Sequence, residues 1–308
     1  MLNYARLAST FRVTKAGPNM LNRVLALVAL VASSGCATTL STMDTARTTP
    51  PKKVQLGVDY GLHVPLGWTG GVFSAATSMA QNKFDDKPVF TAVEAEALYE
   101  SALALALMPP AAIYDFQVRT GLAENLDVGL RYSSTQLRLD TKLRFYSVGS
   151  DDHKRADASI GIGVSKYLFS NPVFEWLDYV KISNFSRWDF EVPLLYSFEY
   201  RRSFMLYCGA KYIYTRFSLD ENLFNLQQKV ADLADQPAVV DKVSSNMHFF
   251  GSVIGLGGGY KRVFLFTELN YGYVWARPEL YSFIDKQKKQ RNLGGVTLYP
   301  AIGIVVRI

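Results

Sequence analysis

The chain has 308 residues and a formal net charge of +6. Residues 1–35 contain four basic residues and no acidic one, so the rest of the chain is nearly neutral. A nearly neutral chain excludes the basic composition of a nucleic-acid-binding protein. Aromatic residues make up 13%, which suits strands that cross both interfaces of a membrane. No run of about 20 apolar residues follows residue 36, so no transmembrane helix is expected in the mature protein.

The first predicted element is a secretory leader over residues 1–35. Arg23 precedes a short apolar run from Val24 to Ala32, and small residues follow that run. A charged head, an apolar core and a small-residue cleavage site, in this order, are typical of a signal peptide. Because the pattern begins at Met20, we interpret Met20 as a plausible true start of the protein.

The leader ends in Ser33-Ser34-Gly35-Cys36, which resembles the lipobox of bacterial lipoproteins, although Ser33 stands where that family usually has an aliphatic residue. In that family the cysteine is acylated and becomes the new N-terminus, so the resemblance implies covalent acyl chains on Cys36. The alternative is an ordinary cleaved signal with a chance cysteine. Residues 36–52 are rich in Thr and Pro and lack periodicity, so we expect a lipid-anchored flexible tether.

Residues 53–308 are predicted to form one all-β domain. Apolar and polar residues alternate with period two, most clearly over 187–200, where Phe190 and Val192 alternate with Asp189 and Glu191. Strands of about 9–11 residues are long enough to cross a bilayer at a tilt. The alternation predicts strands at 53–64, 111–120, 126–134, 136–146, 156–167, 187–200, 203–216, 247–260, 263–275 and 294–308.

The links between these strands alternate between short and long. Short links include Arg201-Arg202 and Lys261-Arg262, whereas 65–110 and 217–246 are long. This asymmetry resembles that of bacterial outer-membrane barrels, although those usually end in an aromatic residue and this chain ends in Ile308. The resemblance implies a closed antiparallel transmembrane β-barrel of about ten strands. An even strand count places both termini, and with them the lipid anchor, on the periplasmic side.

Two long links carry helical patterns and are expected to be extracellular insertions. Residues 91–107 are rich in Ala, Leu and Glu and are followed by Pro109. Ser218 and Glu221 have capping-box spacing and open an apolar stripe at helical period. This stripe is expected to cover the barrel mouth, to pack against the helix of the first link, or to bind another envelope protein, so that the extracellular mouth is capped.

Parity along the strands places many charged residues inside the barrel. A ten-stranded barrel is narrow, so these charges are expected to pair and fill the lumen. The alternative is an ion-selective channel. The expected lumenal acids are Asp59, Asp115, Asp127, Asp140, Asp157, Asp189, Glu191, Glu199 and Glu268. The expected bases are Arg119, Arg131, Arg138, Lys142, Arg144, Arg201, Lys211 and Arg307.

No motif predicts catalytic, cofactor or metal residues. Asp151-Asp152-His153 resembles a hydrolase cluster, but it lies in a predicted short turn. His63 and His248 lie at the extracellular ends of strands, and His248 has Ser244 and Ser245 nearby without a recognisable spacing. No paired His, Cys or Asp spacing indicates a metal.

Two further features have structural interpretations. Gly255 to Gly259 lacks the Lys-Ser/Thr ending of a phosphate loop and lies within a predicted strand, where glycine relieves crowding inside a barrel. Cys208 shares a face with Leu206 and Tyr212 and is expected to be an unpaired, lipid-facing thiol.

These observations predict a non-enzymatic outer-membrane β-barrel lipoprotein with a structural or adhesive role, or a role as a subunit of an envelope complex. Its expected partners are membrane lipid and an envelope protein, and no cofactor is expected. The alternatives are a small-solute transport pore and a rim hydrolase of lipid or peptide.

Overall fold

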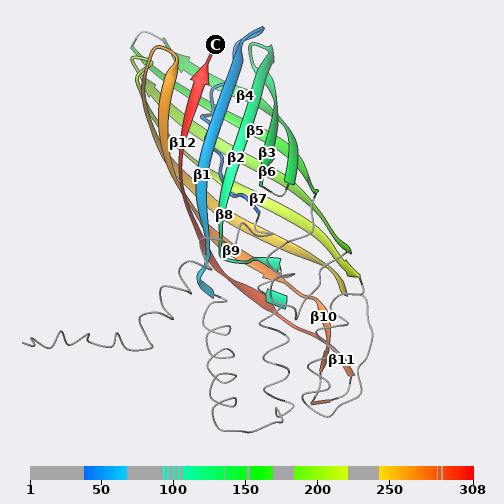
Figure 1. Cartoon of the computed structure of the whole chain (residues 1–308). Helices are drawn as coiled ribbons and strands as arrows, with labels where there is room; N and C mark the ends of the chain where they lie inside the picture. Colours follow the sequence, from blue (N-terminus) through cyan, green and yellow to red (C-terminus); the bar gives the residue numbers. More distant parts are fainter. Residues whose placement is uncertain are drawn as a thin grey trace, which may run out of the picture.

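The computed structural model describes residues 38–67, 107–134, 136–150, 153–168, 184–220, 243–282, 284–285 and 287–308, and a few positions between 93 and 104. The leader and Cys36 lie outside these residues. Ten antiparallel strands form a closed barrel in the order β1-β12-β9-β8-β7-β6-β5-β4-β3-β2 (Figure 1). The strands are β1 (Val54–Pro65), β2 (Ala111–Ala123), β3 (Leu126–Ser133), β4 (Gln136–Gly149), β5 (Lys154–Tyr167), β6 (Asn184–Tyr200), β7 (Phe204–Asp220), β8 (Val243–Tyr260), β9 (Val263–Ala276) and β12 (Leu293–Arg307). The predicted ten-stranded antiparallel barrel is therefore confirmed.

The two ends of the barrel differ, and Figure 1 shows them at the top and bottom. At one end, here called the short-turn end, tight links join β2 to β3, β4 to β5, β6 to β7 and β8 to β9, and β12 ends beside the start of β1. At the opposite, long-loop end, a small hairpin extends from the barrel, made of β10 (Glu279–Ser282) and β11 (Gln287–Gln290). The sequence analysis did not predict this hairpin.

The hairpin and the link before β2 are held together at the long-loop end. Ser282 donates a hydrogen bond to Glu96, and Arg291 forms ion pairs with Glu96 and Glu100. Leu103 and Leu107 from the same link are buried. Most of the expected helix 91–107 lies outside the described residues, so this helix stays a prediction.

The second expected helix does not begin where its capping signal stands. Ser218 and Asp220 belong to β7, where they pair with Ser186 and Asn184 of β6. Cross-strand pairing along a long hairpin outweighs a local capping preference of about 1 kcal/mol. Residues 221–242, which carry the apolar stripe, lie outside the described residues.

The outer wall of the barrel is apolar. Every second side chain of a strand points outward, and large apolar residues at these positions keep much of their surface exposed; for Leu194 the exposed fraction is 47% and for Ile162 63%. A soluble protein of this size rarely exposes so many large apolar side chains over one continuous surface. Among the described residues, no helix is long and apolar enough to cross a membrane.

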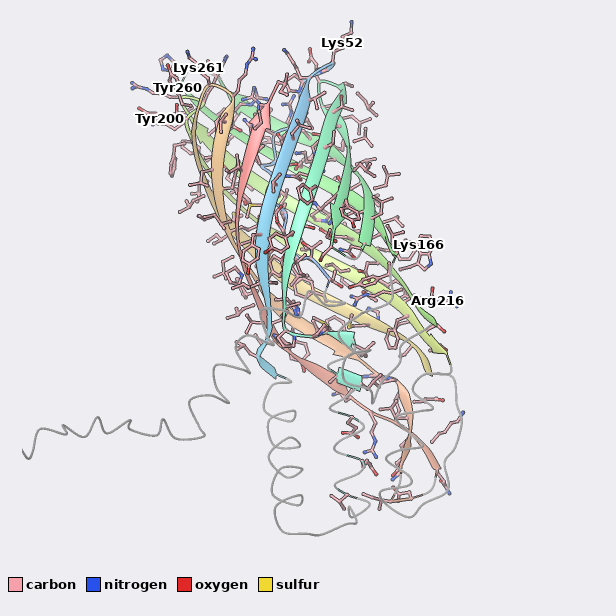
Figure 2. All side chains as sticks on the ribbon, viewed as in Figure 1. Lys52, Lys166, Tyr200, Arg216, Tyr260 and Lys261 are labelled. Atoms are coloured by element: carbon pink, nitrogen blue, oxygen red, sulfur yellow. The ribbon has the colours of Figure 1, made fainter. Side chains whose placement is uncertain are left out.

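Aromatic residues lie on this wall near both ends. Near the long-loop end, His248 stacks on Trp275 with ring centroids 5.2 Å apart, and the Tyr212 hydroxyl is 2.8 Å from His248 Nδ1. At the short-turn end, Arg201 lies over the ring of Tyr200 and Lys261 over that of Tyr260. Figure 2 labels Tyr200, Tyr260 and Lys261 at this end. Amphipathic rings at two levels, with an apolar band between them, are the arrangement expected at the two faces of a bilayer.

Candidate functional site

One half of the lumen wall, formed by β2 to β6, is charged. Arg119 is central to it: its guanidinium lies 2.5 Å from Asp127 and also contacts Asp140. Next to this group, Arg138 pairs with both Asp140 and Glu191. The side chains are buried, so each charge depends on its neighbours in place of water.

The other half, formed by β7, β8, β9 and β12, is mostly apolar. Its inward side chains include Tyr207, Phe249, Val253, Phe264, Phe266, Val274 and Tyr299. Glycines on the same wall make room for these rings. A Cβ atom at Gly255 would overlap the ring of Tyr207, and one at Gly257 would lie 2.7 Å from that of Phe266. The glycine run is thus part of β8 and relieves crowding, as predicted.

The N-terminal segment 38–50, here called the plug, runs through the lumen between these two walls (Figure 1). Near the long-loop end, the Thr38 hydroxyl contacts Arg187 and Asp189. At the other end, the Thr49 amide donates to Asp127 at 2.8 Å. From there, Pro51 bridges to Gly121 and the chain enters β1. Residues 38–46 are all buried.

The plug is held mainly through its backbone. Glu268 accepts hydrogen bonds from the Thr42 and Met43 amides, each at 2.7 Å. Arg131 donates to the Ser41 and Thr42 carbonyls, and Lys211 donates to the Leu40 carbonyl at 2.6 Å. Polar wall residues thus satisfy plug groups that water would otherwise hydrate.

The side chains of the plug divide between the two halves of the lumen. Asp44 faces the charged half, where Lys142 Nζ lies 2.5 Å from its carboxylate and Arg119 Nε 3.2 Å. Leu40 and Met43 belong to the buried apolar cluster that contains Tyr207 and Phe266. The plug is therefore two-sided, although its sequence has no regular period.

This arrangement differs from the flexible tether expected over residues 36–52. Thr side chains and free backbone groups favour a solvated coil only where water is the best hydrogen-bonding partner. Inside the barrel, buried carboxylates and guanidinium groups offer charged partners, whose hydrogen bonds are stronger. The described part of the segment is consequently ordered within the lumen.

Two cavities border the plug among the residues that the structure describes. A cavity of about 20 Å³ remains beside Asp44 and Arg138. A larger one, of about 220 Å³, opens where the plug leaves the barrel at the short-turn end. We call this second cavity the basic pocket.

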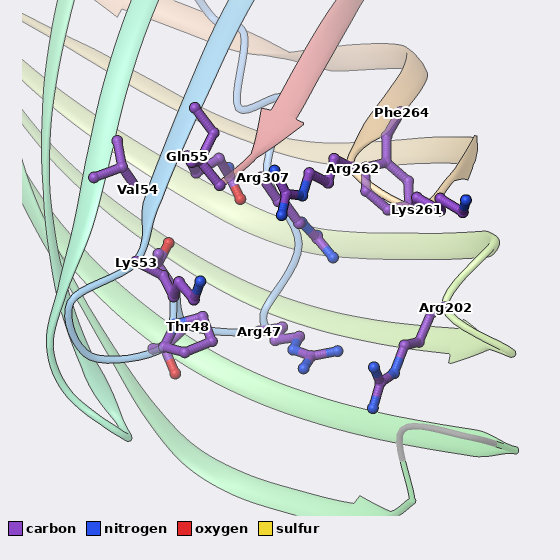
Figure 3. Close-up of a pocket in the computed structure, with 13 residues that line it drawn as sticks. Arg47, Thr48, Lys53, Val54, Gln55, Arg202, Lys261, Arg262, Phe264 and Arg307 are labelled. Carbon is purple, nitrogen blue, oxygen red and sulfur yellow. The ribbon is translucent and has the colours of Figure 1, made fainter.

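The basic pocket is lined by six cationic side chains and no acidic one (Figure 3). They come from separate segments: the plug, the start of β1, the β6–β7 turn, the β8–β9 turn and the end of β12. Figure 3 shows Arg47, Arg202 and Arg307 around the same opening. The six residues are Arg47, Lys53, Arg202, Lys261, Arg262 and Arg307.

Among the described residues, one acidic side chain pairs with these cations. Glu199, next to the pocket, pairs with Arg47 at 2.9 Å and with Arg307 at 3.6 Å. The main-chain end at Ile308 also lines the pocket. Arg307 in addition lies over the ring of Phe264, 4.8 Å from its centroid. Arg47 and Arg202 have further interactions, whereas Lys53, Lys261 and Arg262 form no ion pair with any residue that the structure describes.

Several cations at this end occupy backbone conformations that disfavour them. Lys52, Arg201, Arg202 and Lys261 have φ angles of 63°, 50°, 53° and 57°. This left-handed region costs a non-glycine residue about 1–2 kcal/mol, and tight hairpin turns usually place Asn, Asp or Gly there. Basic residues therefore stand at four turn positions where local conformation favours other residue types.

Most of the predicted lumenal charges are placed correctly. All nine predicted acids are buried, as are Arg119, Arg131, Arg138, Lys142 and Lys211. The prediction for Arg201 is wrong. This residue is exposed in the β6–β7 turn, because β6 ends at Tyr200. Two bases were missed, Arg187 and Arg155, which pair with Asp189 and Asp157. Both face the lumen by the same parity: Arg187 is the first residue of the predicted strand 187–200, and Arg155 lies one residue before the predicted strand 156–167.

The candidate histidines lie apart from one another. His63 is buried between the Pro109 carbonyl and Thr297, each at 3.0 Å. His248 faces outward with Tyr212 as its hydrogen-bond partner, while Ser245 donates to the Asn246 carbonyl. His153 is exposed at the short-turn end, and Asp151 and Asp152 lie outside the described residues.

Within the described part of the chain, no group of His, Cys, Asp and Glu side chains could hold a metal ion. Cys208 is free and exposed on the outer wall, as predicted.

No protein-family model matches the sequence, and neither does any curated protein. Among solved structures, the chain is similar to the outer membrane protease OmpT from Escherichia coli, with 9% identity, a TM-score of 0.41 and coverage of 87% of this chain and 100% of that chain. It is similar to OprG from Pseudomonas aeruginosa, with 9% identity, a TM-score of 0.35 and coverage of 86% and 99%. It is also similar to outer membrane phospholipase A from Escherichia coli, with 11% identity, a TM-score of 0.27 and coverage of 87% and 94%. The likeness is to bacterial outer-membrane β-barrels and concerns the fold alone.

Proposed function

We propose that this protein is a non-enzymatic outer-membrane lipoprotein whose barrel is closed by its own N-terminal segment and which acts as a structural subunit of the envelope. The observation that carries the proposal is the plug: residues 38–46 are buried in the lumen and bound by charged groups of both walls. A barrel filled in this way offers solutes no continuous aqueous path. Its surfaces for other envelope components are then its two ends.

The apolar outer wall and its two aromatic levels support a location in the outer membrane, because closed barrels are the β-structures that satisfy every backbone group in lipid. Acylation of Cys36 rests on the lipobox-like sequence before it. Thr38 contacts Asp189 near the long-loop end. Cys36 lies outside the residues that the structure describes, so the side of the membrane on which its acyl chains would lie stays a prediction.

Conductance in planar bilayers tests the closed lumen against the transport-pore alternative. We expect the wild-type protein to conduct little. A variant in which residues 39–48 are replaced by a Gly-Ser repeat of equal length keeps the connection to β1 but removes the plug side chains, and it should give a stable conductance. Lys288→Ser with Lys289→Ser, on the exposed hairpin, is the matched control. Steady wild-type conductance at the level of the plug variant would contradict the proposal.

Metabolic labelling with a palmitate analogue tests the anchor. Cys36→Ala should abolish labelling, whereas Cys208→Ser, which removes the exposed thiol of the outer wall, should leave it unchanged. Labelling that persists in Cys36→Ala would place the modification elsewhere and remove the basis for calling the protein a lipoprotein.

A further inference from the structure

We propose that the basic pocket is a binding site for a compact multivalent phosphate anion that enters from the short-turn end. The proposal goes beyond the closed-lumen function. It rests on the convergence of six cationic side chains from separate segments on one cavity of about 220 Å³. Such convergence brings like charges together, which is unfavourable unless an anion lies among them.

The cationic lining of the pocket favours a multivalent ligand. Glu199 serves Arg47 and Arg307, but among the residues that the structure describes Lys53 and Arg262 have no carboxylate within ion-pairing distance. A single carboxylate would leave several cations unneutralised. A diphosphate or a clustered pair of phosphate groups carries enough charge and enough acceptor oxygens for lysine and arginine donors from opposite sides of the pocket.

The turns that frame the pocket provide a second, independent observation. Arg202 and Lys261 line the pocket from left-handed turn positions, and Arg201 and Lys52 flank it in the same conformation. Glycine or asparagine would form these turns with less strain. Backbone strain of this kind is typical of functional sites, where the side chain is needed for binding.

Arginine dominates the pocket, with Arg47, Arg202, Arg262 and Arg307, and its planar fork matches the oxygens of a phosphate group. The apolar ring of Phe264 and the plug close the inner side of the pocket. The ligand is therefore held at the mouth of the barrel and does not pass through it. Its phosphate groups come either from a soluble or polymeric compound or from a lipid headgroup of the adjacent leaflet.

Calorimetric titration of the full-length protein in nanodiscs of zwitterionic lipid, with pyrophosphate as the probe, tests this inference. We expect saturable binding at one site, which weakens as salt is added. The triple variant Arg202→Gln, Lys261→Gln, Arg262→Gln changes only turn residues, so the barrel should stay folded. It should weaken binding roughly tenfold or more for each charge-assisted hydrogen bond removed. Lys166→Gln with Arg216→Gln, toward the long-loop end (Figure 2), is the matched control and should bind as the wild type does.

The outcomes separate clearly. Equal binding by the wild type and the triple variant, or binding that does not saturate, overturns the site. A second titration in nanodiscs that contain anionic phospholipid identifies the source of the phosphate. Weaker pyrophosphate binding there, in the wild type but not in the triple variant, shows that lipid headgroups occupy the pocket. Unchanged binding assigns it to a soluble or polymeric phosphate. Neither titration depends on whether the lumen conducts, so this inference and the closed-lumen proposal can fail separately.

Discussion

The two halves of the lumen hold the same plug by different physical means. The charged half, on β2 to β6, contacts Asp44 and the plug carbonyls through Arg119, Arg131 and Lys142. The apolar half packs rings against Leu40 and Met43. The two halves are therefore expected to be sensitive to different mutations. Contacts with the charged half depend on charge balance, and contacts with the apolar half depend on side-chain volume.

Two buried charged residues of the apolar half support this distinction. Lys211 and Glu268 lie in this wall and both bind the plug backbone, and Lys211 Nζ also lies 3.4 Å from Glu191 of β6. A charge in an apolar wall is costly unless it has dedicated partners. The plug supplies several of these partners, which couples the order of the plug to the stability of that wall.

The largest effect is expected in the charged half. Arg119→Met removes the cation that Asp44, Asp127 and Asp140 share. Loss of one partner from a buried ionic group costs about 3–5 kcal/mol, because the remaining charges stay buried. Urea unfolding of the barrel in lipid vesicles measures the loss. The matched control Arg216→Met, at an exposed position, should change the free energy of unfolding by less than about 0.5 kcal/mol. Equal, small effects would show that pairing does not hold this half.

A volume change in the apolar half should have the next largest effect. Leu40→Ala empties a fully buried position of the plug and should lower the free energy of unfolding by about 2–5 kcal/mol. Leu40→Met keeps the volume and should cost less than about 1.5 kcal/mol. If both variants unfold like the wild type, Leu40 does not anchor the plug. The plug variant used for conductance shows the effect of removing all plug side chains together.

The sequence was sufficient to predict the strands of the barrel and most of the lumenal charges. The predicted strands agree with the observed ones to within a few residues, because successive side chains of a strand face the outer wall and the lumen in turn. The period-two pattern therefore persists over Phe190, Val192 and Leu194. Lumenal charges followed from parity. Arg201 failed because parity was continued past the last strand residue, Tyr200.

The plug was not predictable by these means. Its contacts use backbone amides and carbonyls of Leu40, Ser41, Thr42 and Met43, which every sequence possesses, so no residue pattern marks them. The basic pocket had a weak signal: the dipeptides Arg201-Arg202 and Lys261-Arg262 stand in turns that usually favour Asn or Gly. Their convergence with Arg47 depends on the path of the plug, which only the three-dimensional structure reveals.

The smallest effects distinguish two tyrosines of the apolar half. The Tyr207 hydroxyl donates to Glu268 at 2.6 Å, whereas the Tyr299 hydroxyl lies 3.2 Å from that of Thr39. A hydrogen bond to a charged group contributes about 1.5–3 kcal/mol and a neutral one about 0.5–1.5 kcal/mol. Tyr207→Phe should therefore destabilise the barrel more than Tyr299→Phe, by the same urea measurement. Its effect should lie at the lower end of its range, because Glu268 keeps the plug amides and the Asn270 side chain, 2.5 Å away, as donors. The reverse order would mean that the plug is held more firmly at Thr39 than at Glu268, and the coupling proposed for the apolar wall would then be wrong.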